Sequence, residues 1–384
     1  MKKVLIFSTA YEPYMGGAEV AVAELAKRMS DECIFFMITY RFDMSLPRYE
    51  HRREMEVYRL GYGTIFDRWF LFPFLAFFKA LAIHRKQQVD LAWAVMVSYA
   101  SIGAYFLKLF QPKIPLLLTL QEGDSQIHLR YGKFGMLGLW WRLMLKKADY
   151  IQTISGYLAD LALKRGARSK IAVVPNGVNL EHFSRPPERS ELERYRNFFK
   201  LGPGDFVVIT VSRLVHKNGI DLLISAMAQL PAHFKLLVVG GGALAQRLRS
   251  QAYTLGISER VIFVGNVPHP ELPYYLNLAK VFVRPSRSEG LGNAFLEAMA
   301  AHIPIIGTPV GGIKEFLKDG ATGLFCKEED PGDLAAKIQA LAQSDALREQ
   351  LSDTAHALVK SRYSWESVTA GMRKIFSELY QQGK

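Results

Sequence analysis

The sequence predicts an α/β protein built from two doubly wound parallel sheets in tandem. Short, continuous apolar runs alternate with segments of helical spacing, this pattern stops in a charged stretch near the middle of the chain, and it then starts again. Continuous apolar strands are typical of parallel sheets that helices cover on both faces. A length of 384 residues also exceeds what one ordinary core requires.

The first domain is expected over residues 1–183. Its predicted strands are VLIFST (4–9), CIFFMIT (33–39), LAWAV (91–95), PLLLTLQ (115–121), YIQTIS (150–155) and IAVVPN (171–176). Helical spacing follows the glycine pair Gly16-Gly17 and recurs around 98–110. Residues 184–204 are rich in charge, proline and glycine, which indicates a linker region.

The second domain is expected over residues 205–363. Its predicted strands are FVVITVS (206–212), FKLLVVGGG (234–242), VIFVGNV (261–267), VFVRPS (281–286), PIIGTP (304–309) and GLFC (323–326). A helix, NAFLEAMAAHIP, is expected to end at Pro304. The last helix, SWESVTAGMRKIFSELY (364–380), is expected to pack back on the first domain.

The composition limits the choice of partners and compartment. The formal net charge of +12 favours an anionic partner, which leaves nucleic acid, an acidic lipid surface and a phosphorylated ligand open. Cys33 and Cys326 lie far apart, as expected of ordinary thiols in a reducing, cytoplasmic compartment. The first apolar run is too short for a signal-peptide core, and the apolar stretches 69–83 and 93–110 are too short or too interrupted to span a bilayer.

The segment SRSEGLGNAFLEAMA (286–300) places two carboxylates around a glycine-rich turn. Glu289 belongs to the loop after a predicted strand, and Glu297 belongs to the following helix. Gly290 and Gly292 permit close approach of a ligand to the backbone, and the amides at the start of the helix point outward as donors. A ligand with hydroxyl or phosphate groups suits this pattern. The alternative is a capping glutamate beside an ordinary surface glutamate.

Two further motifs follow predicted strands. In VSRLVHKNGIDLLISAM (211–227), Arg213 and Lys217 bracket a loop and could hold a diphosphate, although two solvated charges in a turn have the same pattern. Gly16 and Gly17 occupy the first strand-to-helix turn, a common place for an anion. The sequence contains no GxGxxG, GxxxxGK[ST], HExxH or serine-elbow motif, and no D-x-D motif that would hold a metal.

Together these motifs resemble those of the retaining glycosyltransferases of family 4, which have the two-domain GT-B fold. The resemblance includes the E-x7-E signature within SRSEGLGNAFLEAMA, a GRLxxxKG-like SRLVHKNG, and an N-terminal glycine loop in AYEPYMGGAE. It extends to VVPNGVNLEHF (173–183), to the block before the acid pair and to GTPVGGIKEFLKDGATGLF (307–325), and so covers nearly the whole chain.

The resemblance implies a nucleoside-diphosphate sugar bound in a cleft between two facing Rossmann-like domains. It assigns the diphosphate to Arg213 and Lys217, the ribose to Glu297, and the transferred sugar to Glu289. The remaining implied contacts come from the amides of Gly290, Leu291 and Gly292, from Gly16 and Gly17 toward phosphate and acceptor, and from the backbone near Asn266 and Val267 toward the base. No metal and no bound cofactor is implied, because two cations can neutralise the phosphates, and retention is expected to follow from front-face attack.

Two positions depart from the family pattern. Gln121, in TLQEGDS, stands where the family usually has a histidine, and glutamine cannot carry a proton charge near neutral pH. Glu122, Asp124 and His128 are nearby candidates to compensate. His302 stands where glycine is frequent, which we interpret as a detail of a surface turn.

Two segments of the first domain, 67–86 and 133–147, mix large aromatic residues with lysine and arginine. This composition suits helices at a membrane surface, but also ordinary amphipathic core helices. With the basic charge, it favours a peripheral location at the inner face of the cell membrane and a sugar or lipid-linked acceptor, in glycolipid or cell-surface polysaccharide synthesis. The alternative is a non-catalytic partner subunit that binds a nucleotide sugar, motivated by Gln121. A nucleic-acid partner is not expected, because charge alone supports it.

Overall fold

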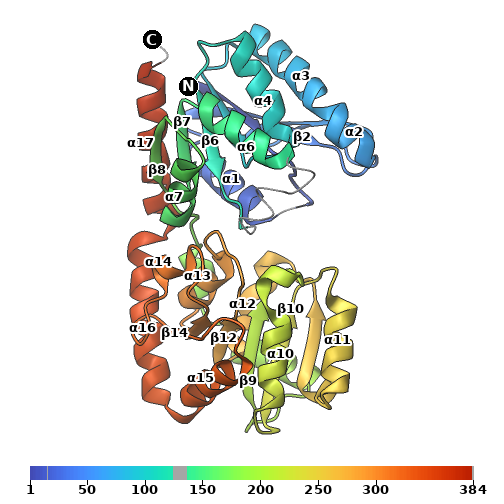
Figure 1. Cartoon of the computed structure of the whole chain (residues 1–384), viewed down its shortest axis with the longest axis vertical. Coiled ribbons are helices and arrows are strands. Elements are labelled where there is room, and N and C mark those ends of the chain that lie inside the picture. Colours follow the sequence, from blue (N-terminus) through green and yellow to red (C-terminus); the bar gives the residue numbers. More distant parts are fainter. Residues whose placement is uncertain (15, 124–135, 383–384) are drawn as a thin grey trace. The chain divides into compact units, whose positions relative to one another are not determined.

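The computed structural model describes residues 1–14, 16–123 and 136–382. The chain forms two compact units (Figure 1). Among the described residues, unit 1 contains 1–14, 16–122, 136–177 and 365–382, and unit 2 contains 123 and 178–364. Each unit has its own parallel sheet, so the predicted α/β class with two doubly wound sheets is confirmed.

The sheet of unit 1 has eight strands in the order β3-β4-β2-β1-β5-β6-β7-β8. Its strands are β1 (Lys2–Phe7), β2 (Cys33–Tyr40), β3 (Tyr49–His51), β4 (Met55–Leu60), β5 (Leu91–Val95), β6 (Leu116–Leu120), β7 (Tyr150–Thr153) and β8 (Lys170–Val173). All neighbours are parallel except β3 and β4, which are antiparallel at the edge. Strands β3 and β4 were not predicted, because MEVYRL alternates buried and half-buried residues instead of forming a continuous apolar run.

Helices cover both faces of this sheet. The helices of unit 1 are α1 (Gly17–Arg28), α2 (Ile65–Phe70), α3 (Phe72–Gln87), α4 (Tyr99–Phe110), α6 (Met136–Lys147), α7 (Gly156–Lys164) and α17 (Trp365–Gln382). Val4 and Ile6 of β1 belong to the same apolar cluster as Met372 and Phe376 of α17. Leu5 and Phe7 point to the opposite face and are also fully buried, as the two-residue period of a strand requires.

The sheet of unit 2 has six parallel strands in the order β11-β10-β9-β12-β13-β14. They are β9 (Phe206–Val211), β10 (Phe234–Val239), β11 (Val261–Gly265), β12 (Val281–Arg284), β13 (Ile305–Gly307) and β14 (Leu324–Phe325). The helices are α8 (Leu180–Ser184), α9 (Arg189–Phe198), α10 (Ile220–Ala228), α11 (Ala245–Thr254), α12 (Leu272–Leu278), α13 (Asn293–Ala300), α14 (Ile313–Phe316), α15 (Pro331–Gln343) and α16 (Asp345–Arg362), with short 3-10 turns at His216–Asn218, Ser258–Arg260 and His269–Glu271.

The segment 184–204, expected as a linker, contains helix α9, and all of it belongs to unit 2. Tyr195 of α9 stacks on Tyr274 of α12, with ring centroids 5.5 Å apart. None of the α9 residues is fully buried, and this is why the segment has the composition of a connector. The passage from unit 1 to unit 2 instead lies between Gly177 and Val178.

Helix α13 ends at Ala300, earlier than the expected stop at Pro304. The chain turns at His302, whose φ of 55° lies in the left-handed region. This backbone conformation favours glycine, which explains why a glycine suits the position. The His302 ring stacks on that of His356 with centroids 3.7 Å apart, a contact that glycine would not make.

Candidate functional site

The sheet of unit 2 reverses its strand order between β9 and β12. Strands β10 and β11 lie on one side of β9, and β12, β13 and β14 lie on the other. Open α/β sheets bind ligands beyond the carboxyl ends of their strands at such a switch point. The loops that leave these two strands, 212–219 and 285–292, contain Arg213, Lys217 and Glu289. The topology therefore brings two motifs that are distant in sequence to one place.

The two loops contact each other through their backbones. Gly219 has a φ of 67°, and a Cβ at this position would lie 1.9 Å from the carbonyl oxygen of Pro285. The amide of Arg287 donates a hydrogen bond of 2.7 Å to the carbonyl of Lys217. Only glycine permits so close an approach. Gly219 therefore allows loop 212–219, which contains Arg213 and Lys217, to pack against loop 285–292, which contains Glu289.

A third loop, 307–312, packs against the backbone of loop 285–292. A Cβ on Gly311 would lie 1.9 Å from the carbonyl oxygen of Glu289, and one on Gly312 would lie 2.1 Å from that of Gly290. The amide of Gly312 donates to the Glu289 carbonyl over 3.2 Å. The backbone around Glu289 is therefore fixed from two sides.

The Glu289 carboxylate is held by a buried cation that was not predicted. Arg284, the last residue of β12, donates from Nη2 to Oε2 of Glu289 over 2.5 Å, and the Gly290 amide donates to Oε1 over 3.0 Å. The side chains of Arg284 and Glu289 are 7% and 14% exposed. The guanidinium also stacks over Phe295 with 4.7 Å to the ring centroid. Arg284 is therefore a positioning residue for Glu289.

Arg287, in loop 285–292, connects the two loops through its guanidinium. Its guanidinium donates from Nη1 and Nη2 to the two carboxylate oxygens of Asp221, each over 2.8 Å, and from Nη1 to the His216 carbonyl over 2.8 Å. The hydrogen bonds that Arg287 donates to Asp221 raise the pKa of Arg287. Burial acts to raise the pKa of Asp221, but the hydrogen bonds and charge of Arg287 outweigh it and hold that pKa below its ordinary value.

The cations predicted for the diphosphate lie at the two ends of loop 212–219. The Arg213 side chain is exposed and has no ion-pair partner among the described residues, while Lys217 is half-buried. The carbonyl of Arg213 accepts a hydrogen bond of 2.7 Å from Nδ2 of Asn218, the buried residue that directly follows Lys217. The loop is thus ordered by its own hydrogen bonds and leaves the Arg213 guanidinium exposed to solvent.

Glu297 lies on α13, which starts after Gly292, a residue with φ of 102°. Its Oε1 is 3.0 Å from Nε2 of His269, which lies in the turn before α12. The side chain of Leu291 is fully buried, so that residue can offer a ligand only its backbone. Glu297 and His269 therefore form a polar pair near the middle of α13.

Asn266 and Val267 follow β11, two strands away from β9. Asn266 is exposed, and a Cβ on Gly241 would come within 2.9 Å of its Oδ1. The turn after β10 therefore approaches the segment that was predicted to contact a base.

Three predicted site residues belong to unit 1. The amide of Gly16 donates over 2.9 Å to Oε2 of Glu19, so a protein carboxylate occupies the turn where Gly16 and Gly17 were expected to admit an anion. Gln121 follows β6, and its Oε1 accepts a hydrogen bond of 3.0 Å from Nδ2 of Asn176.

The residues named to compensate for Gln121 have different environments. Glu122 is buried and accepts from the amides of Val97, over 2.6 Å, and Gln121, over 2.9 Å. These bonds fix the loops after β5 and β6, which is a structural role. Asp124 and His128 lie outside the described residues.

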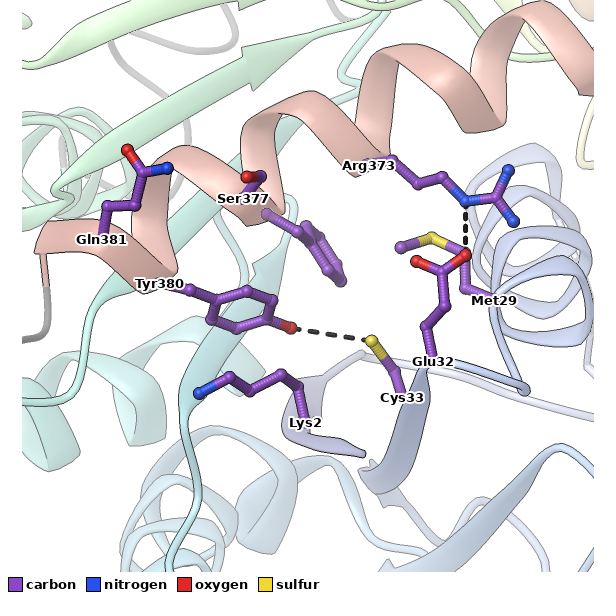
Figure 2. A pocket seen from close by; sticks show the side chains of 9 residues that line it. Lys2, Met29, Glu32, Cys33, Arg373, Ser377, Tyr380 and Gln381 are labelled. Carbon is purple, nitrogen blue, oxygen red and sulfur yellow. Dashed lines mark hydrogen bonds and ion pairs between the residues drawn. The ribbon is translucent and has the colours of Figure 1, made fainter.

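A separate hollow of about 330 Å³ lies in unit 1 between α17 and the amino ends of β1 and β2 (Figure 2). At this hollow, Cys33 Sγ and the Tyr380 hydroxyl are 3.6 Å apart, and Arg373 Nε pairs with Glu32 Oε1 over 2.7 Å. Burial raises the pKa of Cys33, which makes the thiol a poor nucleophile. Because ligands of parallel sheets bind at the opposite, carboxyl edge, we do not place the functional site here.

In the part of the chain that the structure describes, no three histidine, cysteine, aspartate or glutamate side chains are grouped as metal ligands. The sequence motifs did not predict four residues that contact the predicted site residues or their loops: Arg284, Arg287, Asp221 and His269. Arg284 had a detectable signal, because VFVRPS places a charge at the carboxyl end of an otherwise continuous apolar strand. The others look like ordinary surface charges, and only the packing of the loops shows their partners.

Comparison with known proteins agrees with this arrangement. The model "Glycosyltransferase Family 4" matches residues 15–182, and "Glycosyl transferases group 1" matches residues 192–358. An uncharacterized glycosyltransferase of Methanocaldococcus jannaschii is 27% identical over 98% of both chains. The alpha-monoglucosyldiacylglycerol synthase of Streptococcus pneumoniae is 25% identical over 97% of this chain and 84% of its own.

Among solved structures, a protein of Anabaena in complex with UDP-glucose superposes with a TM-score of 0.82. The two chains are 19% identical, and the match covers 98% of this chain and 100% of the other. At this identity the likeness concerns the fold. With one family model on each half of the chain, two Rossmann-like units and the motif loops at a switch point, this chain belongs to the family 4 glycosyltransferases of the GT-B fold.

Proposed function

We propose that the chain is a retaining glycosyltransferase that moves a sugar from a nucleoside-diphosphate sugar to an acceptor. The supporting observation is the meeting of loops 212–219 and 285–292 at the switch point of unit 2. This arrangement brings the loop that contains the exposed Arg213 and the half-buried Lys217 into contact with the loop that contains the fixed carboxylate of Glu289. Cations next to a hydroxyl-binding carboxylate suit a ligand that joins phosphates to a sugar.

The cations would act on the leaving group. In the proposed reaction, the bond between the anomeric carbon and the diphosphate oxygen breaks, and a bond from the acceptor oxygen forms on the same face of the sugar. The acceptor proton passes to the departing phosphate, which carries away the electron pair. Arg213 and Lys217 would stabilise the negative charge that grows on that phosphate, and preorganised charges of this kind are often the largest catalytic contribution. Two cations can replace a divalent metal in this role.

The remaining residues would position the donor. Glu289 would accept hydrogen bonds from the transferred sugar and Glu297 from the ribose, with His269 orienting Glu297. The amides of Gly290, Leu291 and Gly292 would donate to sugar or phosphate oxygens. The base would contact the backbone at Asn266 and Val267, and Gly16, Gly17 and Gln121 would face phosphates and acceptor from unit 1.

The proposed acceptor is a sugar or a lipid-linked molecule in glycolipid or cell-surface polysaccharide synthesis, at the cytoplasmic side of a membrane. The near-full-length likeness to a synthase named for a glucosylated diacylglycerol supports this choice. Likewise, the UDP-glucose complex of the Anabaena protein supports a nucleotide sugar as the donor.

A donor-hydrolysis screen tests the proposal. The protein is incubated with common UDP- and GDP-sugars, with and without EDTA, and release of the nucleoside diphosphate is measured. We expect one donor to be hydrolysed at the same rate in both conditions. Lys217→Ala should lower kcat/KM about tenfold or more, whereas Lys280→Ala, an exposed lysine of the same unit, should not.

The same screen separates the enzyme from a non-catalytic partner subunit. A partner subunit would bind one nucleotide sugar in calorimetry but would release no diphosphate, also after Gln121→His. The anomeric configuration of a transferred sugar, read by NMR, distinguishes retention from inversion.

A further inference from the structure

Unit 1 exposes several large apolar side chains on α2, α3 and the end of α4. We call this set the aromatic ridge: Ile65, Phe66, Phe70, Phe74, Phe78 and Phe110, which are between 50% and 74% exposed. The rings of Phe66 and Phe70 are 4.9 Å apart, and Phe77 contacts both Phe78 and Phe110 with centroids 5.1 Å apart. Grouped exposed apolar side chains of this kind indicate an interaction site.

The aromatic ridge is distinct from the side of α3 that packs in the core of unit 1. Helix α3 already buries Ala76, Phe77 and Ala80 on its inner side, against α4 and the sheet. The exposed residues Phe74 and Phe78 are four positions apart, so they form a second, outward stripe of the same helix. A helix that is apolar on both sides needs a partner on each side, and one side of α3 has none among the described residues.

The charged residues of the helices around the ridge indicate the charge of its partner. Helices α2, α3, α4 and α6 carry a single acid, Asp67. That acid is buried, and it accepts hydrogen bonds from Tyr40 and Thr64. The carboxylate is therefore not presented to a partner.

The cations near the ridge, in contrast, reach solvent. The exposed ones are Arg85 and Lys86 at the end of α3, Lys113 after α4, and Arg142 and Lys146 on α6. Contacts join α3 to α4 and α4 to α6, so these helices lie side by side on one face of the sheet (Figure 1). These neighbouring helices thus combine exposed bulky apolar side chains with exposed cations, and their described residues include no exposed acid.

We propose that this face binds the surface of an anionic lipid bilayer, with the aromatic ridge inserted among the acyl chains near the headgroups. Arg85, Lys86, Lys113, Arg142 and Lys146 face the lipid phosphates. Phenylalanine insertion together with basic charge supplies the two signals that stable surface binding requires. A second copy of this chain is a poorer occupant, because two such faces would bring like charges together.

The binding is interfacial. Within the described residues, no helix has the length and apolarity that crossing a bilayer would require. Such binding would bring unit 1 to a lipid-carried acceptor, and to that extent it rests on the proposed function. The vesicle assay below contains no donor, so a failure of membrane binding and a failure of sugar transfer are distinguished.

The test is sedimentation of the full chain with vesicles of phosphatidylcholine alone or of phosphatidylcholine with phosphatidylglycerol. We expect binding to the anionic vesicles that weakens with added salt. The double variant Phe66→Ser/Phe78→Ser should lower the partition coefficient by about tenfold or more, since each ring carries a large apolar area. Its matched control is Phe198→Ser/Tyr253→Ser, which removes the equally exposed rings of unit 2 and should bind as the wild type does.

A charge-reversal pair completes the design. Arg85→Glu/Lys86→Glu should lower binding to anionic vesicles roughly tenfold or more, whereas Lys164→Glu/Lys360→Glu, with the same change in net charge, should lower it much less. Equal losses in the ridge variants and in their control variants would overturn the proposal. Absence of wild-type binding to the anionic vesicles would overturn it as well. A dimer in sedimentation velocity that Phe66→Ser/Phe78→Ser converts to monomer, without vesicle binding by the wild type, would assign the face to a second copy. Thermal unfolding of each variant establishes that it is folded.

Discussion

The buried pair between Arg284 and Glu289 is the contact in unit 2 whose removal is most informative. Arg284→Met removes the cation while keeping an unbranched apolar side chain next to Phe295. Glu289→Gln removes the charge but keeps the shape and one acceptor for the Gly290 amide. Each single change leaves the other partner buried without its counter-charge, which is the costly situation for an ion pair.

The structure sets the size of the effect. Breaking a fully buried pair costs about 3–5 kcal/mol. Here Glu289 is 14% exposed and keeps its bond from Gly290, so we expect about 3 kcal/mol for Arg284→Met and about 2 kcal/mol for Glu289→Gln. The double variant should lose only about 3 kcal/mol, a coupling of about 2 kcal/mol. For a unit of this size class, 3 kcal/mol corresponds to a fall in Tm of roughly 6–12 °C.

The assay is urea unfolding of the wild type, both single variants and the double variant, with donor hydrolysis measured on each. The exposed pair Arg189–Glu193, with side chains 93% and 60% exposed, is the matched control and should show coupling below about 0.5 kcal/mol. If Arg284 acts by orienting Glu289, Arg284→Met should also lower kcat/KM by about tenfold or more under conditions where it is fully folded. A coupling between Arg284 and Glu289 as small as that of the control pair would refute the reasoning.

Three further outcomes follow from the same loops. Arg213→Ala should lower kcat/KM for donor hydrolysis about tenfold or more without changing the urea midpoint, since its guanidinium is exposed; unchanged hydrolysis would remove Arg213 from the phosphate site. Gly219→Ala should cost at least about 2 kcal/mol and weaken donor binding in calorimetry, because φ is 67° and the new Cβ would meet Pro285; a wild-type urea midpoint would contradict this. Asp221→Asn should destabilise by about 1 kcal/mol at neutral pH, since a partly exposed pair is screened. Because the hydrogen bonds and charge of Arg287 hold the Asp221 pKa below its ordinary value despite burial, that contribution is complete above the ordinary value and is lost as the pH falls through the folded pKa. Urea midpoints of wild type and Asp221→Asn should therefore differ at neutral pH and converge only at acid pH.

The sequence predicted the fold class because buried parallel strands are continuous apolar runs. LAWAV is a strand with the predicted bounds, and every other predicted strand overlaps one in the structure. Strand β4 lacks this signal: MEVYRL alternates buried and partly covered residues, so it is not a continuous apolar run. Helix α9 has the composition of a linker because it packs through a few aromatic rings and buries no residue completely.

The candidate site was predictable only in part. Arg213, Lys217 and Glu289 were identified from their places after strands, and parallel topology brings their loops together. The sequence could not show that Arg284 and Glu289 are partners, because charge pairing depends on where a side chain points after packing. Asp221, one of the carboxylates that bind Arg287, likewise has no sequence pattern that sets it apart from an ordinary surface acid.

Helix α17 has a consequence for how the protein is made. Its residues 365–382 complete the core of unit 1, yet a ribosome synthesises them only after all of unit 2. Unit 2 is almost entirely one stretch, residues 178–364, whereas the core of unit 1 needs residues on both sides of that stretch. One face of β1 and β5 therefore stays incompletely covered until α17 is made. In that interval exposed apolar strands are prone to aggregate, so unit 1 is the unit that chaperones would have to protect until α17 packs on it.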